Sequence, residues 1–239
     1  MIPGRGKLLE IGAGSGWQAK ELSRVGFAVT AIDLLTSNYR EKRVWPVTDY
    51  NGQEIPAEDL TFDFIFSSNT LEHVVGIEKF LLEIKRVMKR DALAIHIMPT
   101  STWRFSSALG HYLRFDRVIY ELSKLWKTPS KKSSLESGAS DYRTISSPNQ
   151  TLPGWIKHRI LPPLHGIRGN ILTEHWYFTE KCWRKLFETA GYEVLDVRKN
   201  NLYYTGHYFL AELLTIDARR RLSCLLGSSC KIYLLKVAS

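Results

Sequence analysis

The chain has 239 residues, a formal net charge of +9 and a hydrophobic content of 44%. This length fits one large domain or one domain with an insertion, and the composition is that of a globular protein with a sizeable core. Three cysteines without CxxC spacing predict reduced thiols, which excludes a disulfide scaffold and a zinc site. No apolar run approaches the roughly 20 residues of a membrane span, and no secretory segment is visible. We therefore expect a cytoplasmic protein.

The positive charge is concentrated in residues 100–172, which contain eleven Lys and Arg residues but only four Asp and Glu residues. The rest of the chain is nearly balanced. A local excess of this kind indicates either an anionic partner, such as nucleic acid, a phosphorylated substrate or an acidic membrane surface, or a solvated basic face. Composition alone leaves both alternatives open.

Short apolar runs and amphipathic stretches alternate along the chain. The run KLLEI, residues 7–11, leads into a glycine-rich loop and predicts a buried strand. Apolar residues at helical spacing predict helices over 17–25, 76–89, 179–191 and most of 207–228. Further strands are predicted over 27–34, 43–52, 62–68, 92–99, 192–200 and 231–238. This alternation predicts an α/β protein with a parallel sheet covered by helices on both faces.

Residues 100–172 interrupt this alternation. They begin with Trp, Tyr, Arg and Lys residues and continue as a stretch rich in Ser, Lys and Pro, which is typical of a loop. We expect a single domain, 1–239, in which 100–172 is a basic insertion after the fifth strand.

The glycine-rich loop reads E-x-G-x-G-x-G, with Glu10 followed by Gly12, Gly14 and Gly16. The dinucleotide fingerprint G-x-G-x-x-G requires a third glycine where this chain has Trp17, and the triphosphate loop requires a Lys-Ser/Thr pair that is missing. A carboxylate beside the glycines is a poor neighbour for a pyrophosphate. It suits a ligand that carries an ammonium group.

With these residues the sequence resembles the class I S-adenosylmethionine-dependent methyltransferases. Further segments follow in the family's order, namely an acidic residue after the second strand, DYNGQEIP at 49–56, FDFIFSSNTLEHV at 62–74 and FETAGYEVLDV at 187–197. The segment 62–74 is close to the signature of the family's small-molecule subgroup. The resemblance covers 7–99 and 173–236 and implies a Rossmann-like sheet of seven strands with the last strand antiparallel. It also implies S-adenosylmethionine as cofactor, bound beyond the carboxyl ends of the strands.

The resemblance assigns roles to particular residues. It implies that Asp33 binds the ribose hydroxyls and that Leu34 packs on the adenine. Asn51 stands where the family often has Asp, which changes the expected adenine contact. The residues implied for the cofactor are Glu10, Gly12, Ala13, Gly14, Gly16, Asp33, Leu34, Tyr50, Asn51 and Asn69.

Methyl transfer to an alcohol or phenol needs a base that takes the hydroxyl proton, and histidine is the usual choice. The segment LPPLHGIRGNILTEHWYF returns from the insertion to the sheet, so we favour His165 as the base and His175 after it. His73 is expected to pack or to form hydrogen bonds. We expect the insertion to form the acceptor-binding lid, and we expect no metal.

Aromatic residues mixed with arginines in the insertion favour a hydroxyl-bearing small molecule, with a glycan, a lipid-linked precursor, an isoprenoid quinone and a phenolic metabolite as the classes. The acceptor could be anionic, and peripheral contact with a membrane is compatible with the charge. RNA is a weaker alternative, because SSNT argues against methylation of nucleobase amino groups. A third alternative is a cofactor-binding partner subunit without catalysis.

Overall fold

The computed structural model describes residues 6–113, 164–170, 173–204 and 214–238. Most of the predicted insertion and part of the predicted helix 207–228 lie outside these ranges. The described strands are β1 (Lys7–Ile11), β2 (Ala28–Leu34), β3 (Thr48–Tyr50), β4 (Phe62–Ser68), β5 (Met88–Pro99), β6 (Tyr192–Lys199) and β7 (Cys230–Val237). The described α-helices are α1 (Trp17–Arg24), α2 (Ile77–Val87), α3 (Ser101–Leu113), α6 (Glu174–Tyr177), α7 (Glu180–Thr189) and α8 (Ile216–Leu226). Two 3₁₀ turns are η1 (Arg40–Lys42) and η2 (Leu71–His73).

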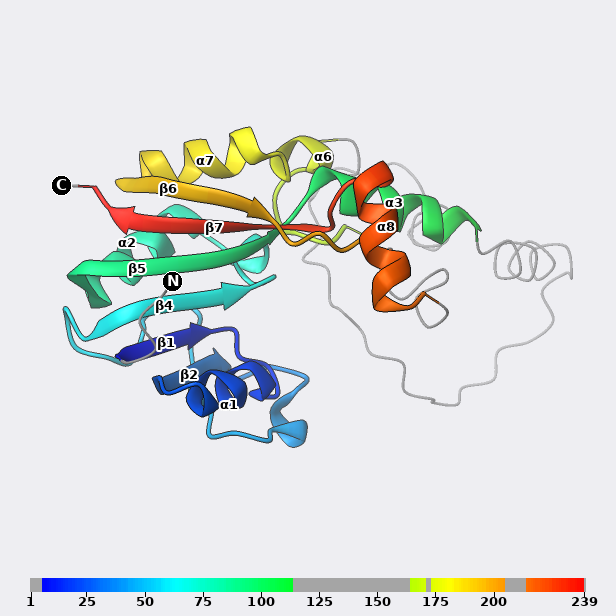
Figure 1. The fold of residues 1–239 in the computed structure, drawn as a ribbon. Coiled ribbons are helices and arrows are strands. Elements are labelled where there is room, and N and C mark those ends of the chain that lie inside the picture. The colour runs from blue at the N-terminus through cyan, green and yellow to red at the C-terminus, as the bar shows by residue number, and fades with distance from the viewer. Residues whose placement is uncertain (1–5, 114–163, 171–172, 205–213, 239) are drawn as a thin grey trace, which may run out of the picture.

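The seven strands form one sheet in the order β3-β2-β1-β4-β5-β7-β6. The pairs β1–β2, β1–β4, β2–β3 and β4–β5 are parallel, whereas β7 runs antiparallel to both β5 and β6. This confirms the predicted α/β sheet with an antiparallel last strand. Figure 1 shows the carboxyl ends of the parallel strands turned toward α3, α6 and α8, which gather at that end of the sheet.

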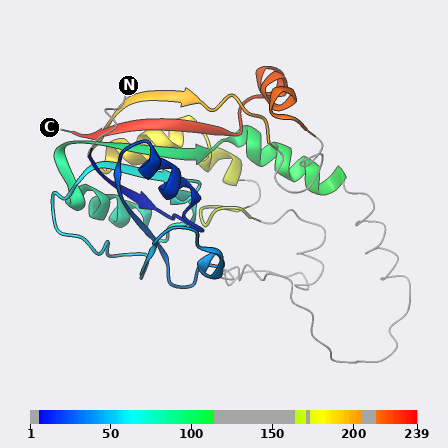
Figure 2. The same cartoon turned by 60° about the horizontal axis from the view of Figure 1, so that its bottom comes forward.

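The two faces of the sheet carry different cores because neighbouring residues in a strand point to opposite sides. Ile32 belongs to a large apolar cluster that includes residues of α2 and α7. Its neighbour Ala31 belongs to a second, smaller cluster with Ala13 and Ala19, in which α1 packs through small side chains. Tyr192 links β6 to α2 within the large core, since its buried hydroxyl donates to Leu81 O at 2.7 Å. A second view shows the helices on both sides of the sheet (Figure 2).

Two predicted boundaries were wrong. The third strand was predicted over 43–52, but β3 spans only Thr48–Tyr50. Pro46 has no N–H for a sheet ladder, and Arg43 turns back to donate to Val47 O at 3.1 Å. The fifth strand was predicted from residue 92, but β5 begins at Met88, directly after α2, because buried Met88 already pairs with Phe62.

Candidate functional site

The glycine-rich loop joins β1 to α1 and is held in place by backbone bonds. The N–H groups of Gly12 and Ala13 donate to Ile32 O at 2.9 and 3.0 Å, so the loop is fastened to β2. Gly12, Gly14 and Gly16 all have positive φ, at 73°, 56° and 81°, a region that favours glycine. The loop therefore depends on all three glycines for its backbone path.

The three glycines differ in what surrounds them. A Cβ at Gly12 would lie 2.4 Å from the Thr70 side chain, and a Cβ at Gly16 would lie 2.7 Å from Trp45 Cβ. A Cβ at Gly14 would meet only the Tyr39 ring, at an ordinary 3.6 Å. Gly14 is thus the position at which the loop leaves room for a ligand.

The carboxyl group of Glu10 lies near the end of β1, directly before this loop in the chain. Its side chain is 1% exposed, and neither carboxylate oxygen has a hydrogen-bond partner among the described residues. Burial, and then the nearby Asp33, raise the pKa of Glu10 to about 7, and the backbone of Ala19 offsets part of this rise. A buried carboxylate without a partner is costly, so the site favours a cationic group beside Glu10. The ammonium group of S-adenosylmethionine fits this requirement.

Asp33 is the penultimate residue of β2, lies close to Glu10 and is 8% exposed. Its carboxylate accepts from Leu34 N at 2.9 Å and from Ser37 Oγ at 2.6 Å, which fixes the direction of the side chain. Burial, and then Asp33, raise the pKa of Tyr50 to about 12, so the phenol stays protonated. Asp33 and Tyr50 thus lie together at the same edge of the sheet, as the resemblance implies.

The expected adenine side is formed by Leu34 and the turn after β3. Leu34 is 43% exposed, and its Cδ2 atom lies 2.8 Å from the position of a Cβ on Gly52. Asn51 Oδ1 accepts from Gln53 N and Glu54 N, both at 2.9 Å. The oxygen of Asn51 therefore supports the turn, and only its NH₂ group is left for a ligand.

Asn69 follows β4 and lies close to the glycine-rich loop. It has a φ of 49°, which asparagine tolerates better than most residues. Cys230 donates its Sγ–H to Asn69 Oδ1 at 3.5 Å, and burial raises the pKa of this thiol to about 11. Thr70 then donates to Ser68 O at 3.1 Å, and its side chain borders Gly12. The segment after β4 is thereby fixed against the loop.

His165 lies against η2, the 3₁₀ turn that directly follows Thr70 in the chain. Its Nε2 atom is 3.6 Å from Glu72 Oε1, and its ring centroid is 4.7 Å from that of His73 and 4.2 Å from that of Trp103. The Glu72 side chain has an exposed fraction of 0%, and its oxygens have no hydrogen-bond partner among the described residues. An imidazole and a buried carboxylate thus face each other beside the expected methyl-transfer position.

Sequence reasoning missed Glu72. The signal was a charged residue between Leu71 and His73 in LEHV, from which only His73 was considered. Ligand atoms of Glu72, His73 and His165 lie within 4.8 Å of one another, so the same three side chains could also hold a metal ion. The sequence had led us to expect none.

His175, the second predicted base, is not part of this group. It lies on α6 with its ring 6.4 Å from that of Phe105. Its neighbour Glu174 is buried and accepts from His165 N. Of the two predicted bases, only His165 reaches the Glu72 carboxylate, whose Oε1 atom also lies 3.9 Å from Nε2 of His73.

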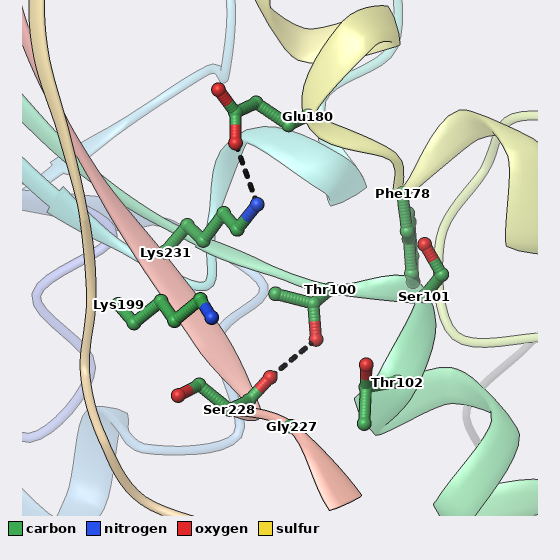
Figure 3. Close-up of a pocket in the computed structure, with 9 residues that line it drawn as sticks. All are labelled: Thr100, Ser101, Thr102, Phe178, Glu180, Lys199, Gly227, Ser228 and Lys231. Carbon is green, nitrogen blue, oxygen red and sulfur yellow. Dashed lines mark hydrogen bonds and ion pairs between the residues drawn. The ribbon is translucent and has the colours of Figure 1, made fainter. Parts of the chain in front are cut away.

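A hollow of about 250 Å³ lies beside this group, at the carboxyl end of β5 (Figure 3). It is lined by Thr100, Ser101, Thr102, Phe178, Glu180, Lys199, Gly227, Ser228 and Lys231. Lys231 pairs with Glu180 at 2.6 Å, and Thr100 Oγ1 donates to Ser228 O at 2.7 Å. Phe178 also approaches His165, with ring centroids 6.3 Å apart. None of the predicted site residues lines the hollow.

Comparison with known proteins identifies the family. A family model described as a methyltransferase domain matches residues 2–197. The chain belongs to this methyltransferase family. Its cofactor is S-adenosylmethionine, as the resemblance implied. The buried Glu10, without a hydrogen-bond partner among the described residues, and the open space at Gly14 fit that molecule.

The curated relatives of this methyltransferase act in quinone biosynthesis by their names. A ubiquinone biosynthesis O-methyltransferase of Pelagibacter ubique is 27% identical over 181 residues, which cover 72% of this chain and 69% of that protein. A demethylmenaquinone methyltransferase of Tropheryma whipplei is 36% identical over 129 residues, which cover 50% of this chain and 52% of that protein. A ubiquinone biosynthesis O-methyltransferase of Rickettsia prowazekii is 31% identical over 98 residues, which cover 37% of this chain and 38% of that protein. The matches thus span from about two fifths to about two thirds of these relatives' own length.

Solved structures share the fold of the methyltransferase. An S-adenosylmethionine-dependent methyltransferase from Methanosarcina mazei aligns with a TM-score of 0.56 and 18% identity, over 99% of this chain and 94% of that one. Another from Mesorhizobium loti aligns with a TM-score of 0.55 and 12% identity, over 98% and 93%. At these identities the likeness shows the fold alone.

The affinity for S-adenosylmethionine should depend on pH through Glu10. The ammonium group needs the ionised carboxylate, whose pKa is raised to about 7, so binding below that pH must release a proton. We expect the affinity to fall about tenfold for each pH unit below about 7, measured by calorimetry. In Glu10→Gln the affinity should be low and nearly independent of pH. A wild-type affinity that stays constant between about pH 5.5 and 7 would separate Glu10 from the cofactor.

Substitution of Gly14 should block the cofactor and largely spare the fold. In Gly14→Val the branched side chain would enter the space that the loop leaves open, and we expect at least about a hundredfold weaker binding. The positive φ should cost about 1–2 kcal/mol of unfolding free energy. Gly76→Val is the matched control, since Gly76 has a φ of 69° and nothing within 4 Å of its Cβ position. Equal cofactor affinity in the two variants would contradict this placement of the ligand.

Proposed function

We propose that this methyltransferase methylates a hydroxyl group of a small quinone-type molecule and that His165 is the general base. The observation that carries the proposal is the pairing of His165 with the buried Glu72, at 3.6 Å, directly after the segment that borders the glycine-rich loop. The names of the relatives from Pelagibacter ubique and Tropheryma whipplei support a quinone-type acceptor. The small-molecule signature in SSNTLEHV agrees with this class.

The chemistry requires little more than alignment and one proton acceptor. Bound S-adenosylmethionine supplies a methyl group on a positively charged sulfur. The acceptor oxygen would form its bond to that carbon while the carbon–sulfur bond breaks, and the electron pair of the broken bond would stay on the sulfur, which leaves as a neutral thioether. The hydroxyl proton passes to His165, and the Glu72 carboxylate stabilises the resulting imidazolium. Glu72 lies on the Nε2 side of the ring, so Nδ1 is the nitrogen that takes the proton. A distance slightly beyond hydrogen-bond range is common for such pairs before substrate binds.

The surroundings of His165 suit a flat ring with an apolar tail. The Trp103 indole lies against the imidazole at an interplanar angle of 64°, and Phe178 stands on the same side of the segment. Leu164 and Ile167, on either side of His165, are 38% and 46% exposed. Aromatic faces favour stacking with an aromatic acceptor, and exposed aliphatic side chains favour an isoprenoid tail. We propose that the two ends of residues 100–172 form the acceptor side of the site.

In the ranges that the structure describes, no contact supports the other methyl acceptors considered from the sequence. Among the described residues, no contact favours a glycan or an RNA, and the paired Glu72 and His165 disfavour a subunit without catalysis. Peripheral contact with a membrane and an anionic acceptor stay expectations of the basic segment. Within the part of the chain that the structure describes, no helix is both long and apolar enough to cross a membrane.

Turnover should depend on His165 but not on His175. With S-adenosylmethionine and a hydroquinone carrying a short isoprenoid tail, we expect His165→Ala to lower kcat by about 10²–10⁴. Glu72→Gln should lower kcat by about 10–10², because the imidazolium loses its counter-charge. Cofactor affinity should change by less than about twofold in both variants, since neither residue is assigned to the cofactor.

His175→Ala is the matched control and should retain wild-type turnover. Addition of a chelator should also leave the wild-type rate unchanged. Unchanged turnover in His165→Ala would contradict the assignment of the base. A rate that is lost with the chelator and restored by a divalent metal would show that Glu72, His73 and His165 act through a metal ion instead.

A further inference from the structure

The geometry points to Glu174 as the residue that positions His165, acting together with Arg104 as a buried pair that we call the clamp. This inference rests on the proposed function of His165. Glu174 begins α6 and Arg104 lies in the first turn of α3, so the clamp joins two helices that are 70 residues apart in the sequence.

The carboxylate of Glu174 holds the His165 segment by its backbone. Its Oε1 atom accepts from the N–H groups of His165 and Gly166, at 2.8 and 2.6 Å. Its Oε2 atom accepts from Arg104 Nε. The Glu174 and Arg104 side chains are 0% and 3% exposed, so these bonds form away from water, where they are strong.

Both partners of the clamp are fixed to the sheet. Arg104 N donates to Thr100 O at 3.1 Å, at the carboxyl end of β5, and Thr100 is bonded in turn to Ser228 O. On the other side, Ile167 N donates to Glu72 O at 3.1 Å. The backbone of the His165 segment is thus held at two points, by the clamp and by η2, and the imidazole between them faces Glu72.

Stability alone does not explain why a charged pair is buried at this position. A buried ion pair contributes little stability compared with apolar residues of similar size, because both charges lose their hydration. Two apolar side chains would leave the N–H groups of His165 and Gly166 without a hydrogen-bond acceptor. The carboxylate therefore acts on the placement of His165, and a misplacement of about 1 Å can cost about a hundredfold in rate.

Two double variants separate this role from folding. Arg104→Met/Glu174→Gln removes both charges but keeps an amide oxygen that accepts from His165 N and Gly166 N. Arg104→Met/Glu174→Met removes both charges and the acceptor as well. The two double variants therefore differ in the side-chain amide of Glu174→Gln, with its acceptor oxygen and its NH₂ group, and neither leaves an unpaired buried charge. Glu78→Gln is the control, because it breaks an exposed ion pair between Glu78 and Arg168 of the same segment, 3.0 Å long.

Hydrogen exchange of the segment 164–170, measured by mass spectrometry, tests the contact without any acceptor. We expect exchange about tenfold faster in the Met/Met variant than in the wild type, and near-wild-type exchange in the Met/Gln variant and in Glu78→Gln. Equal exchange in the Met/Met variant and the wild type would overturn the clamp.

Turnover with the short-tailed hydroquinone tests the consequence. We expect kcat to fall about tenfold to a hundredfold in the Met/Met variant at unchanged affinity for S-adenosylmethionine, and to be restored to within about threefold of the wild type in the Met/Gln variant. Wild-type kcat in the Met/Met variant, or loss of kcat and cofactor affinity together in both double variants, would overturn the positioning role. Unchanged turnover in His165→Ala would instead overturn the base assignment, whatever the exchange of the segment shows.

Discussion

The carboxylate of Glu10 lies at the end of β1, almost without contact with solvent and without a hydrogen-bond partner among the described residues. Burial and Asp33 oppose its ionisation and raise its pKa to about 7, against a smaller opposing effect of the Ala19 backbone, so the ionised and protonated forms are both populated at neutral pH. The positive-φ glycines that follow leave room above it rather than fill it. We propose that a cation beside Glu10 completes the site, and S-adenosylmethionine carries such a cation together with the methyl group.

The rest of the site is arranged around the same edge of the sheet. The parallel order of β2, β1 and β4 brings Asp33, Glu10 and Asn69 to neighbouring strand ends, because parallel strands finish on one side. The antiparallel β7 then adds Cys230 against Asn69. The proposed base comes from elsewhere in the chain, since His165 reaches this edge on a segment held by η2 and by Glu174.

The sequence was sufficient for the elements with a clear pattern. KLLEI has the apolar run of a buried strand, and the spacing of the glycine-rich loop weakened the dinucleotide and triphosphate interpretations. The resemblance to the methyltransferases then implied the fold and the cofactor. The late start of β3 was readable from the sequence, since Pro46 has no N–H for a sheet ladder. The start of β5 at Met88 was missed because its pairing partner, Phe62, lies far away in the sequence. Glu72 and the Arg104–Glu174 pair were missed for the same reason. A charge between apolar residues shows that something must satisfy it, but only the fold shows which residue does so.

Calorimetric titration of the wild-type protein with S-adenosylmethionine, its demethylated product and NAD tests the central claim most directly. The account predicts that the first two bind one molecule per chain at one common site, since the ammonium group that faces Glu10 is present in both. It predicts no binding of NAD, whose pyrophosphate would meet the buried carboxylate. Binding of NAD at the glycine-rich loop, or no binding of S-adenosylmethionine, would contradict the account.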